Sequence, residues 1–246
     1  MKGERQIMLT FLGRGSGFSD NHNCAFFIHE DSLVLMDCSI MAFLKMKNAG
    51  IDKFSDGKKI NRIVIMITHT HSDHIAGLPM LVHFSYFVWK LPIEIIVSSN
   101  EVKENMEYYL INIDGCAETA FNVCLFEDKK GKEGYEWLLE TIPTSHVPQL
   151  SGKCFGYKMK IEGKSVVYTG DTRCIEDFIP YLDESGYLYS ECSAIDSGVH
   201  TPIWKLTEYN DFFREKKIKV YLMHLDDEDK IKKAIEGTDF EFAPLF

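Results

Sequence analysis

Short apolar segments alternate with polar turns along the chain, and most of them are rich in β-branched and aromatic residues. Segments of this length and composition are typical of β-strands. The pattern predicts strands at residues 7–12, 25–28, 33–36, 63–67, 93–97, 155–161, 165–168 and 220–223.

Other segments show the longer apolar spacing that is typical of helices. They lie at residues 41–48, 78–89, 101–111, 176–182 and 202–215, the last with Pro202 in its expected first turn. The early strands follow one another through short turns, whereas the later strands alternate with helices. This mixture predicts sheets covered by helices, an α/β or α+β class.

The chain shows no internal repeat and no long Gly, Pro or Ser linker, so we expect one domain over residues 1–246. The irregular stretch 114–135 is expected to be a solvated loop, and so is the acidic run from Asp226. The segment with Gly13, Gly15 and Gly17 leads into a strand rather than a helix. It therefore favours a tight connection between strands over a phosphate-binding loop.

The net charge and the spacing of the cysteines argue against several classes of protein. Lys and Arg number 27 against 37 Asp and Glu, a formal charge of −10, which argues against broad electrostatic capture of nucleic acid. No secretory leader or membrane-spanning run is visible. The seven cysteines are scattered and never spaced C-x-x-C, so we expect reduced thiols in a cytoplasmic protein.

The strongest chemical signal is RIVIMITHTHSDHIAGLP, in which a buried-looking strand is followed by His69, His71, Asp73 and His74. Imidazole and carboxylate groups are ligands for zinc and other first-row metals, and several of them at one strand end can converge on a point. A lone H-x-H pair would more often lie on the surface. Four such residues directly before a helix indicate a metal site.

Three further ligand-type residues each follow a strand-like segment. They are His146 in TIPTSHVP, Asp171 in SVVYTGD and His224 in KVYLMH. Each of them alone would more readily be structural. Together with the first cluster they give the ordered set HxHxDH, His, Asp, His.

This ordered set resembles that of the metallo-β-lactamase superfamily, and it extends here from Asp37 in LMD to His224. The resemblance implies an αββα sandwich with a dinuclear metal site at one edge. The ligand sets it implies are His69, His71 and His146 for one metal, Asp73, His74 and His224 for the other, and Asp171 as the bridge. By the same resemblance, Asp37 supports the ligands without binding metal.

Two divalent ions, zinc with manganese or iron as alternatives, imply hydrolysis. Two cations about 4 Å apart lower the pKa of a shared water and stabilise charge on the substrate oxygens. Asp73 is expected to accept a hydrogen bond from the resulting hydroxide. The ligand set contains no Cys, which argues against the β-lactamase branch, and the fold alone does not select a substrate.

Two segments resemble ribonuclease Z and its relatives. Glu191 in LYSECSA and His200 in GVHTPIW look like the Glu and His motifs of that branch, in which the histidine acts beside the scissile phosphate. A carboxylate partner would keep the imidazole protonated for the leaving oxygen. The alternative for His200 is a surface or helix-capping residue. A weaker match, FLGRGSGF followed by NHNCAFFI, would place His22 or Asn23 near the substrate.

The segment between His146 and Asp171 has no room for the arm with which tRNA-processing members of this branch grip their substrate. Residues 147–170 instead resemble two strands joined by a turn. The chain is therefore similar to the armless cyclic-nucleotide phosphodiesterases, including the anti-Pycsar enzymes that phages use against defence signals. The sequence predicts hydrolysis of 3′,5′-cyclic mononucleotides.

Several alternatives stay open. They are a tRNA 3′ endonuclease, a thioesterase or lactonase, and a module that sequesters a nucleotide without cleaving it. The aromatic stretch HFSYFVWKLP is expected to lie in the core or in a homodimer interface rather than to stack bases. The sequence does not distinguish the metal, the base, or 3′,5′- from 2′,3′-cyclic phosphates.

Overall fold

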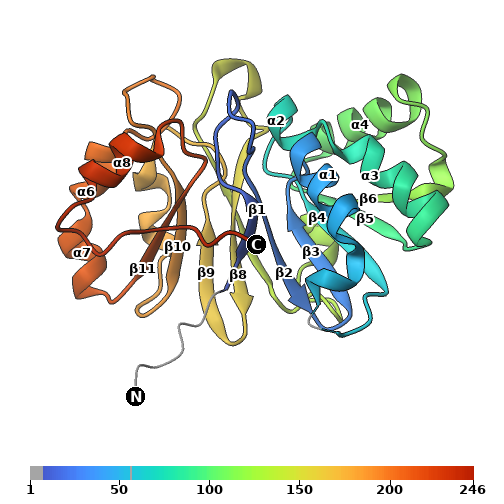
Figure 1. The fold of residues 1–246 in the computed structure, drawn as a ribbon, viewed down its shortest axis with the longest axis horizontal. Helices are drawn as coiled ribbons and strands as arrows, with labels where there is room; N and C mark the ends of the chain where they lie inside the picture. Colours follow the sequence, from blue (N-terminus) through green and yellow to red (C-terminus); the bar gives the residue numbers. More distant parts are fainter. Residues whose placement is uncertain (1–7, 56) are drawn as a thin grey trace.

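The computed structural model describes residues 8–55 and 57–246; Ile7, where the first predicted strand begins, lies outside them. These residues form two six-stranded sheets, and helices cover the outer side of each sheet (Figure 1). The order of layers is helix, sheet, sheet, helix, which confirms the predicted αββα sandwich.

In the first sheet the strands follow the chain order, antiparallel from β1 to β3 and parallel from β3 to β6. They are β1 (Thr10–Gly13), β2 (Cys24–His29), β3 (Ser32–Met36), β4 (Arg62–Met66), β5 (Ile93–Val97) and β6 (Asn122–Leu125). The Gly-rich segment joins the antiparallel strands β1 and β2, as its sequence predicts.

The second sheet has the order β12-β11-β10-β9-β8-β7, antiparallel from β7 to β9 and parallel beyond β9. Its strands are β7 (Leu138–Pro143), β8 (Phe155–Ile161), β9 (Lys164–Tyr168), β10 (Tyr187–Glu191), β11 (Lys219–Met223) and β12 (Glu241–Phe242). The two strands between His146 and Asp171 form a short hairpin, which confirms the predicted absence of an arm.

The α-helices lie mostly outside the sheets. They are α1 (Ile40–Ala49), α2 (Ser72–Ile75), α3 (Leu78–Phe84), α4 (Asn100–Tyr108), α5 (Phe126–Lys129), α6 (Ile203–Thr207), α7 (Asn210–Glu215) and α8 (Glu228–Ala234). Two π-helical segments, η2 (Ser85–Trp89) and η3 (Tyr109–Ile113), continue α3 and α4. The 3-10 turns are η1 (Ile51–Phe54), η4 (Glu118–Ala120), η5 (Pro148–Leu150), η6 (Ile175–Asp177) and η7 (Ile179–Tyr181).

Successive side chains of each strand point to opposite faces of its sheet, so the buried apolar side chains form three separate cores. In β4, Ile63 and Ile65 pack under the helices of the first sheet, whereas Val64 and Met66 face the second sheet. A third cluster lies between the second sheet and α6 to α8. Because both faces of the sheets are buried, the central strands are almost continuously apolar.

The structure corrects four expectations. The stretch 114–135 contains β6, whose Val123 and Cys124 are buried against the rest of the sheet. Residues 176–182 form η6 and η7 rather than one helix, because Pro180 has no N–H with which to continue it. The segment 202–215 is two helices, and Pro202 precedes the first turn.

The fourth correction concerns the acidic run from Asp226, which leads into α8. The side chain of Asp227 accepts a hydrogen bond from the Lys230 amide at the start of this helix, and Ile231 is fully buried beneath it. Among the helices that residues 8–55 and 57–246 form, none combines the length and the apolar character needed to cross a bilayer.

Candidate metal centre

The candidate site lies where parallel strands of both sheets end. Asp37 follows β3, His69 follows β4, Asp171 follows β9, Glu191 ends β10 and His224 follows β11. In sheets of this kind the carboxyl ends of the strands commonly form the ligand site. Strands from both halves of the chain therefore bring distant residues to one edge of the sandwich.

The first group consists of His69, His71, His146 and Asp171. Nδ1 of His71 lies 3.0 Å from Nε2 of His69 and 3.2 Å from Nε2 of His146. Oδ2 of Asp171 lies 3.7 Å from each of the same Nε2 atoms. Ligands of a tetrahedral ion with bonds of about 2.0–2.1 Å are about 3.4 Å apart, so these four atoms fit around one metal.

The second group consists of Asp73, His74, His224 and the same Asp171. Oδ2 of Asp73 lies 3.3 Å from Nε2 of both His74 and His224. Asp171 contributes Oδ1 at 3.4 Å from His74 Nε2 and Oδ2 at 3.4 Å from His224 Nε2. Asp171 is thus shared between the two groups.

The cluster fits a cation better than it fits internal hydrogen bonding. His74 Nε2 and Asp171 Oδ1 are buried without a hydrogen-bond partner among the described residues. Burial raises the pKa of Asp171, but His224, His74 and His69 outweigh it and hold that pKa well below its usual range. Burial lowers the pKa of His74, yet the carboxylates of Asp171 and Asp37 hold it well above the ordinary value. A buried carboxylate group of this kind is stabilised by positive charge.

Asp37 and Thr68 fix the orientation of two ligand-type histidines. Asp37 is fully buried and accepts hydrogen bonds from the Thr68 amide, the Thr68 hydroxyl and Nδ1 of His74, each at 2.8 Å. The Thr68 hydroxyl in turn accepts from Nδ1 of His69 at 3.1 Å. Both imidazoles are therefore held with Nε2 turned toward Asp171.

Two residues of the site have left-handed backbone conformations that side chains rarely adopt. Asp37 has φ 64° and His224 has φ 53°, and each directly follows a strand. Such conformations cost free energy and are found at functional sites, where the surrounding structure maintains them. The sharp turn directs each side chain toward the edge of the sheets.

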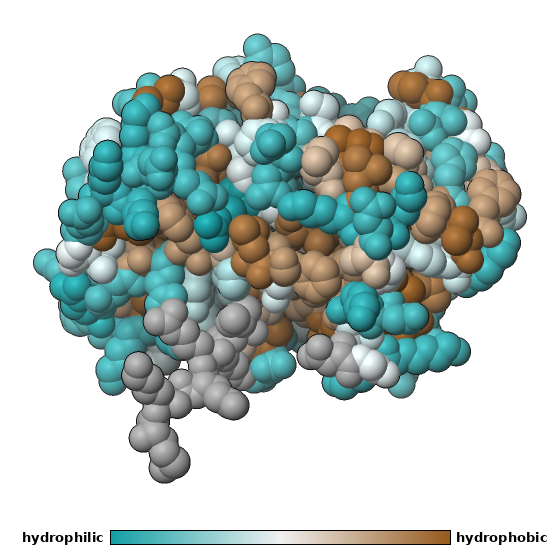
Figure 2. All heavy atoms as spheres, in the orientation of Figure 1, coloured by the Kyte–Doolittle hydropathy of each residue, from teal (hydrophilic) through white to brown (hydrophobic). Residues whose placement is uncertain are grey.

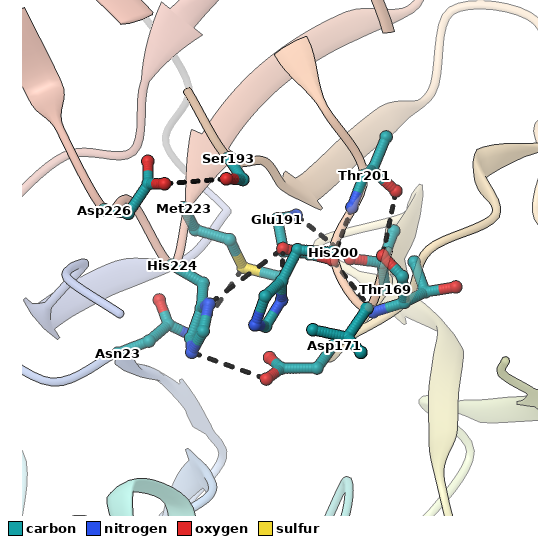
Figure 3. Close-up of polar contacts among 12 residues, drawn as sticks. Asn23, Thr169, Asp171, Glu191, Ser193, His200, Thr201, Met223, His224 and Asp226 are labelled. Atoms are coloured by element: carbon teal, nitrogen blue, oxygen red, sulfur yellow. Dashed lines mark hydrogen bonds and ion pairs between the residues drawn. The ribbon is translucent and has the colours of Figure 1, made fainter. Parts of the chain in front are cut away.

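Glu191 and His200 form a pair beside Asp171 and His224 (Figure 3). His200 Nδ1 donates to Glu191 Oε2 at 3.1 Å, and the Thr172 and Thr201 amides donate to Glu191 Oε1 at 2.9 and 3.1 Å. The centroid of the His200 ring lies 5.0 Å from the ring centroid of His146 and 5.1 Å from the ring centroid of His224.

A cavity of about 480 Å³ opens onto these residues. His71, Asp73, His146, Asp171, His200 and His224 line it, together with Phe18 and Ile195. Phe18 is fully exposed and Ile195 is 59% exposed, so the mouth of the cavity carries apolar side chains.

His22 and Asn23 are not among the described residues that line this cavity. Asn23 is buried and lies beside His224 (Figure 3). Its side-chain amide donates to the Tyr168 hydroxyl at 2.6 Å. Their predicted contact with substrate stays a prediction.

The sequence did not identify several residues that shape the site. Thr68, Thr172 and Thr201 each adjoin a predicted site residue, and adjacency was the signal that could have indicated them. Asp226, in the run expected to be solvated, lines the cavity and accepts hydrogen bonds from the Ser193 hydroxyl at 2.6 Å and the Ala194 amide at 2.7 Å.

The chain is similar to known proteins in sequence and in fold. The family described as Anti-Pycsar protein Apyc1 matches residues 7–243. Relatives named Anti-Pycsar protein Apyc1 include those of Bacillus phage 010DV004, 28% identical with 92% of each chain covered, and of Bacillus phage BSP38, 27% identical with 89% of each covered. The metallo-β-lactamase fold protein YhfI of Bacillus subtilis aligns with a TM-score of 0.69 at 19% identity, covering 95% of this chain and 94% of its own.

Proposed function

The chain belongs to the Anti-Pycsar protein Apyc1 family, and we propose that it is a dinuclear-metal phosphodiesterase that hydrolyses 3′,5′-cyclic mononucleotides and so degrades a defence signal. The observation that carries this proposal is that His200, hydrogen-bonded to the buried Glu191, lines one cavity together with members of both candidate metal groups. A phosphodiester needs both elements, because negative charge must be stabilised on the phosphate and on the leaving oxygen.

The two groups divide the ligands as follows: His69, His71 and His146 would hold one ion, Asp73, His74 and His224 would hold the other, and Asp171 would bridge them. Three histidines and one carboxylate suit zinc, and the second group, with two carboxylates, also suits manganese or iron. When bound, such ions supply Lewis acidity and lower the pKa of water at neutral pH.

His200 would act as the general acid. Because its Nδ1 donates to Glu191, the other ring nitrogen is free to donate a proton to the leaving oxygen. Asp73, which lines the same cavity, would accept a hydrogen bond from the attacking water and so orient it. Asp37 would keep His74 in the orientation that the second ion requires.

The shape and charge of the site favour a small anionic substrate. The β8–β9 hairpin is short and gives no arm with which to hold a folded RNA. The cavity volume of about 480 Å³ lies in the range of small-molecule sites. The formal charge of −10 disfavours long nucleic acids, whereas a cationic centre attracts one phosphate.

We test the proposal by incubating the purified, metal-loaded protein separately with 3′,5′-cyclic mononucleotides, 2′,3′-cyclic mononucleotides and precursor tRNA. The expected product is the nucleoside monophosphate from the 3′,5′-cyclic substrates, lost on chelation and restored by added metal. Turnover of precursor tRNA alone would establish the ribonuclease Z-like alternative. Hydrolysis of thioesters or lactones alone would place the chain in those branches, and tight binding without turnover would indicate sequestration.

We also propose a cytoplasmic homodimer. All seven cysteines, each within the described residues, are free thiols, as a reducing compartment requires. Large apolar side chains are exposed on η2 and at the ends of α4 and η3, where Phe87 is 64%, Tyr108 61% and Ile113 66% exposed. A second copy of the chain would cover this apolar surface.

A further inference from the structure

Outside the candidate active site, the fold brings His83, Asp114 and Cys116 together among the helices of the first sheet. Nε2 of His83 lies 3.0 Å from Oδ2 of Asp114, and Cys116 Sγ lies 3.6 Å from each of these two atoms. A tetrahedral zinc ion, with bonds of about 2.0–2.1 Å to N or O and about 2.3 Å to S, separates such ligands by about 3.4 and 3.6 Å. The three atoms therefore resemble one face of a metal tetrahedron.

The backbone holds these side chains in place. His83 lies in the last turn of α3, whereas Asp114 directly follows η3. The Asp114 amide donates to the Tyr109 carbonyl at 3.0 Å, and the Cys116 amide donates to the Leu110 carbonyl at 2.8 Å. Between them Gly115 has φ 80°, and this left-handed residue reverses the chain so that the carboxylate and the thiol approach one point.

Both π-helical segments in the described residues adjoin this cluster. η2 begins two residues after His83, and η3 ends immediately before Asp114. π-helical turns are rare and are frequently found at functional sites, because they displace the side chains that follow them. Two such segments next to one His–Asp–Cys cluster point to a function for the cluster.

We propose that His83, Asp114 and Cys116 bind a third divalent metal ion of the zinc class, with solvent as the fourth ligand. The His83 and Asp114 side chains are 39% and 36% exposed, so water reaches the open position, whereas Cys116 is buried. One thiolate and one carboxylate neutralise a divalent charge, and the mixed S, N and O donors suit zinc or cobalt.

Metal binding would also change the protonation of Cys116. Burial, together with Asp114, raises the pKa of this thiol to about 12, so the metal-free cluster holds S–H. Binding breaks that S–H bond, forms a metal–sulfur bond and releases one proton to solvent. The ion would then connect the end of α3 to the end of η3 and fix the His83 ring. This ring stacks on that of Phe87, with 6.4 Å between the ring centroids.

Cobalt distinguishes this site from the active site, because the seven proposed active-site ligands include no cysteine. We would strip the protein of metal, add Co²⁺ and record the near-ultraviolet absorption for thiolate-to-cobalt charge transfer. The band is expected in the wild type and absent in Cys116→Ser, with His83→Gln weakening Co²⁺ binding at this band by at least tenfold. Phosphodiesterase activity of the zinc-loaded variants is expected to stay within about twofold of the wild type.

The matched control is Cys174→Ser, which alters the most exposed of the cysteines and should leave the band unchanged. Metal analysis should show one zinc fewer per chain in Cys116→Ser than in the wild type. The proposal is overturned if the Co²⁺-loaded wild type lacks the band, or if the band survives in Cys116→Ser. His83→Gln and Asp114→Asn alter half-exposed side chains, so they test the site even if Cys116→Ser misfolds.

Discussion

At the scale of single residues, Glu191 determines the protonation of His200. Glu191 is fully buried, and burial raises its pKa against the opposing effect of His200. Burial lowers the pKa of His200, but the hydrogen bond and charge of Glu191, together with Asp171 and Asp73, outweigh it and raise that pKa to about 9. His200 is therefore a cation at neutral pH and can act as an acid.

Replacing His200 with Ala should slow hydrolysis of a 3′,5′-cyclic mononucleotide by about 10²–10⁴-fold, because the ribose alkoxide needs a proton. A bis(p-nitrophenyl) phosphate substrate releases a stable phenolate, so its hydrolysis should slow by less than about tenfold. Steady-state kinetics on both substrates measure the difference. Metal content should equal that of the wild type, and loss of an ion would show that His200 is a ligand instead.

Replacing Glu191 with Gln should move the alkaline limb of the pH profile of kcat. In the wild type, His200 is protonated below about pH 9 and loses its proton above it, so kcat should fall as the pH rises through about 9. Without the carboxylate the imidazole pKa falls toward its ordinary value, so the decline should begin at lower pH. An unchanged alkaline limb in Glu191→Gln would contradict the role of His200 as the acid.

At the scale of elements, the sequence predicted the strands and helices that bury most of their residues in a regular apolar pattern. The central strands β3, β4 and β5 are largely apolar on both faces and appear where the pattern indicates them. β6 was missed because only two of its four residues are buried. β7 was indicated only as a strand-like segment before His146, without bounds, because Glu140 and Pro143 interrupt its apolar pattern. Helix α8 was missed because its buried contact depends on one residue, Ile231, in a charged segment.

The cap of α8 gives a stability prediction. Replacing Asp227 with Ala removes the bond to the Lys230 amide, together with the ion pair between Asp227 and the Lys230 ammonium, and should lower the free energy of unfolding. Chemical denaturation measures this change. Asp229→Ala is the matched control, because it removes the same charge from the same first turn without a capping bond, and it should cost less. Equal losses in both variants would assign the effect to charge alone.

At the scale of the whole molecule, parallel strands make distant candidate ligands predictable. His69, Asp171 and His224 each follow a strand, so a pattern read along the chain also indicates which residues meet at one edge. The His83–Asp114–Cys116 cluster could not be predicted in this way, because it depends on how two outer helices pack. The position of Phe18 could not be predicted either, since nothing in a Gly-rich loop indicates that this side chain lies at a cavity mouth.

The distribution of apolar side chains on the surface differs between the two sides of the molecule. In Figure 2 the side of the molecule that carries α8 is mostly teal, whereas brown and tan side chains are more frequent in the middle of this face and on the side that carries α3 and α4. The 3.0 Å contact between His83 Nε2 and Asp114 Oδ2 joins the ends of α3 and η3, so the exposed Phe87 and Ile113 belong to neighbouring segments. Apolar residues so placed are typical of protein interfaces.

Replacing Phe87 with Glu should therefore convert the proposed homodimer into a monomer, because a charge would be buried without a partner at the centre of the contact. Sedimentation velocity across a range of protein concentrations measures the change, with at least a tenfold rise in the dissociation constant expected. Trp204→Glu is the matched control, since Trp204 is 54% exposed on α6, in the helical layer of the other sheet, and it should leave the dimer intact. A monomeric wild type, or a dimer that only Trp204→Glu dissociates, would show that this apolar surface is not where two copies meet.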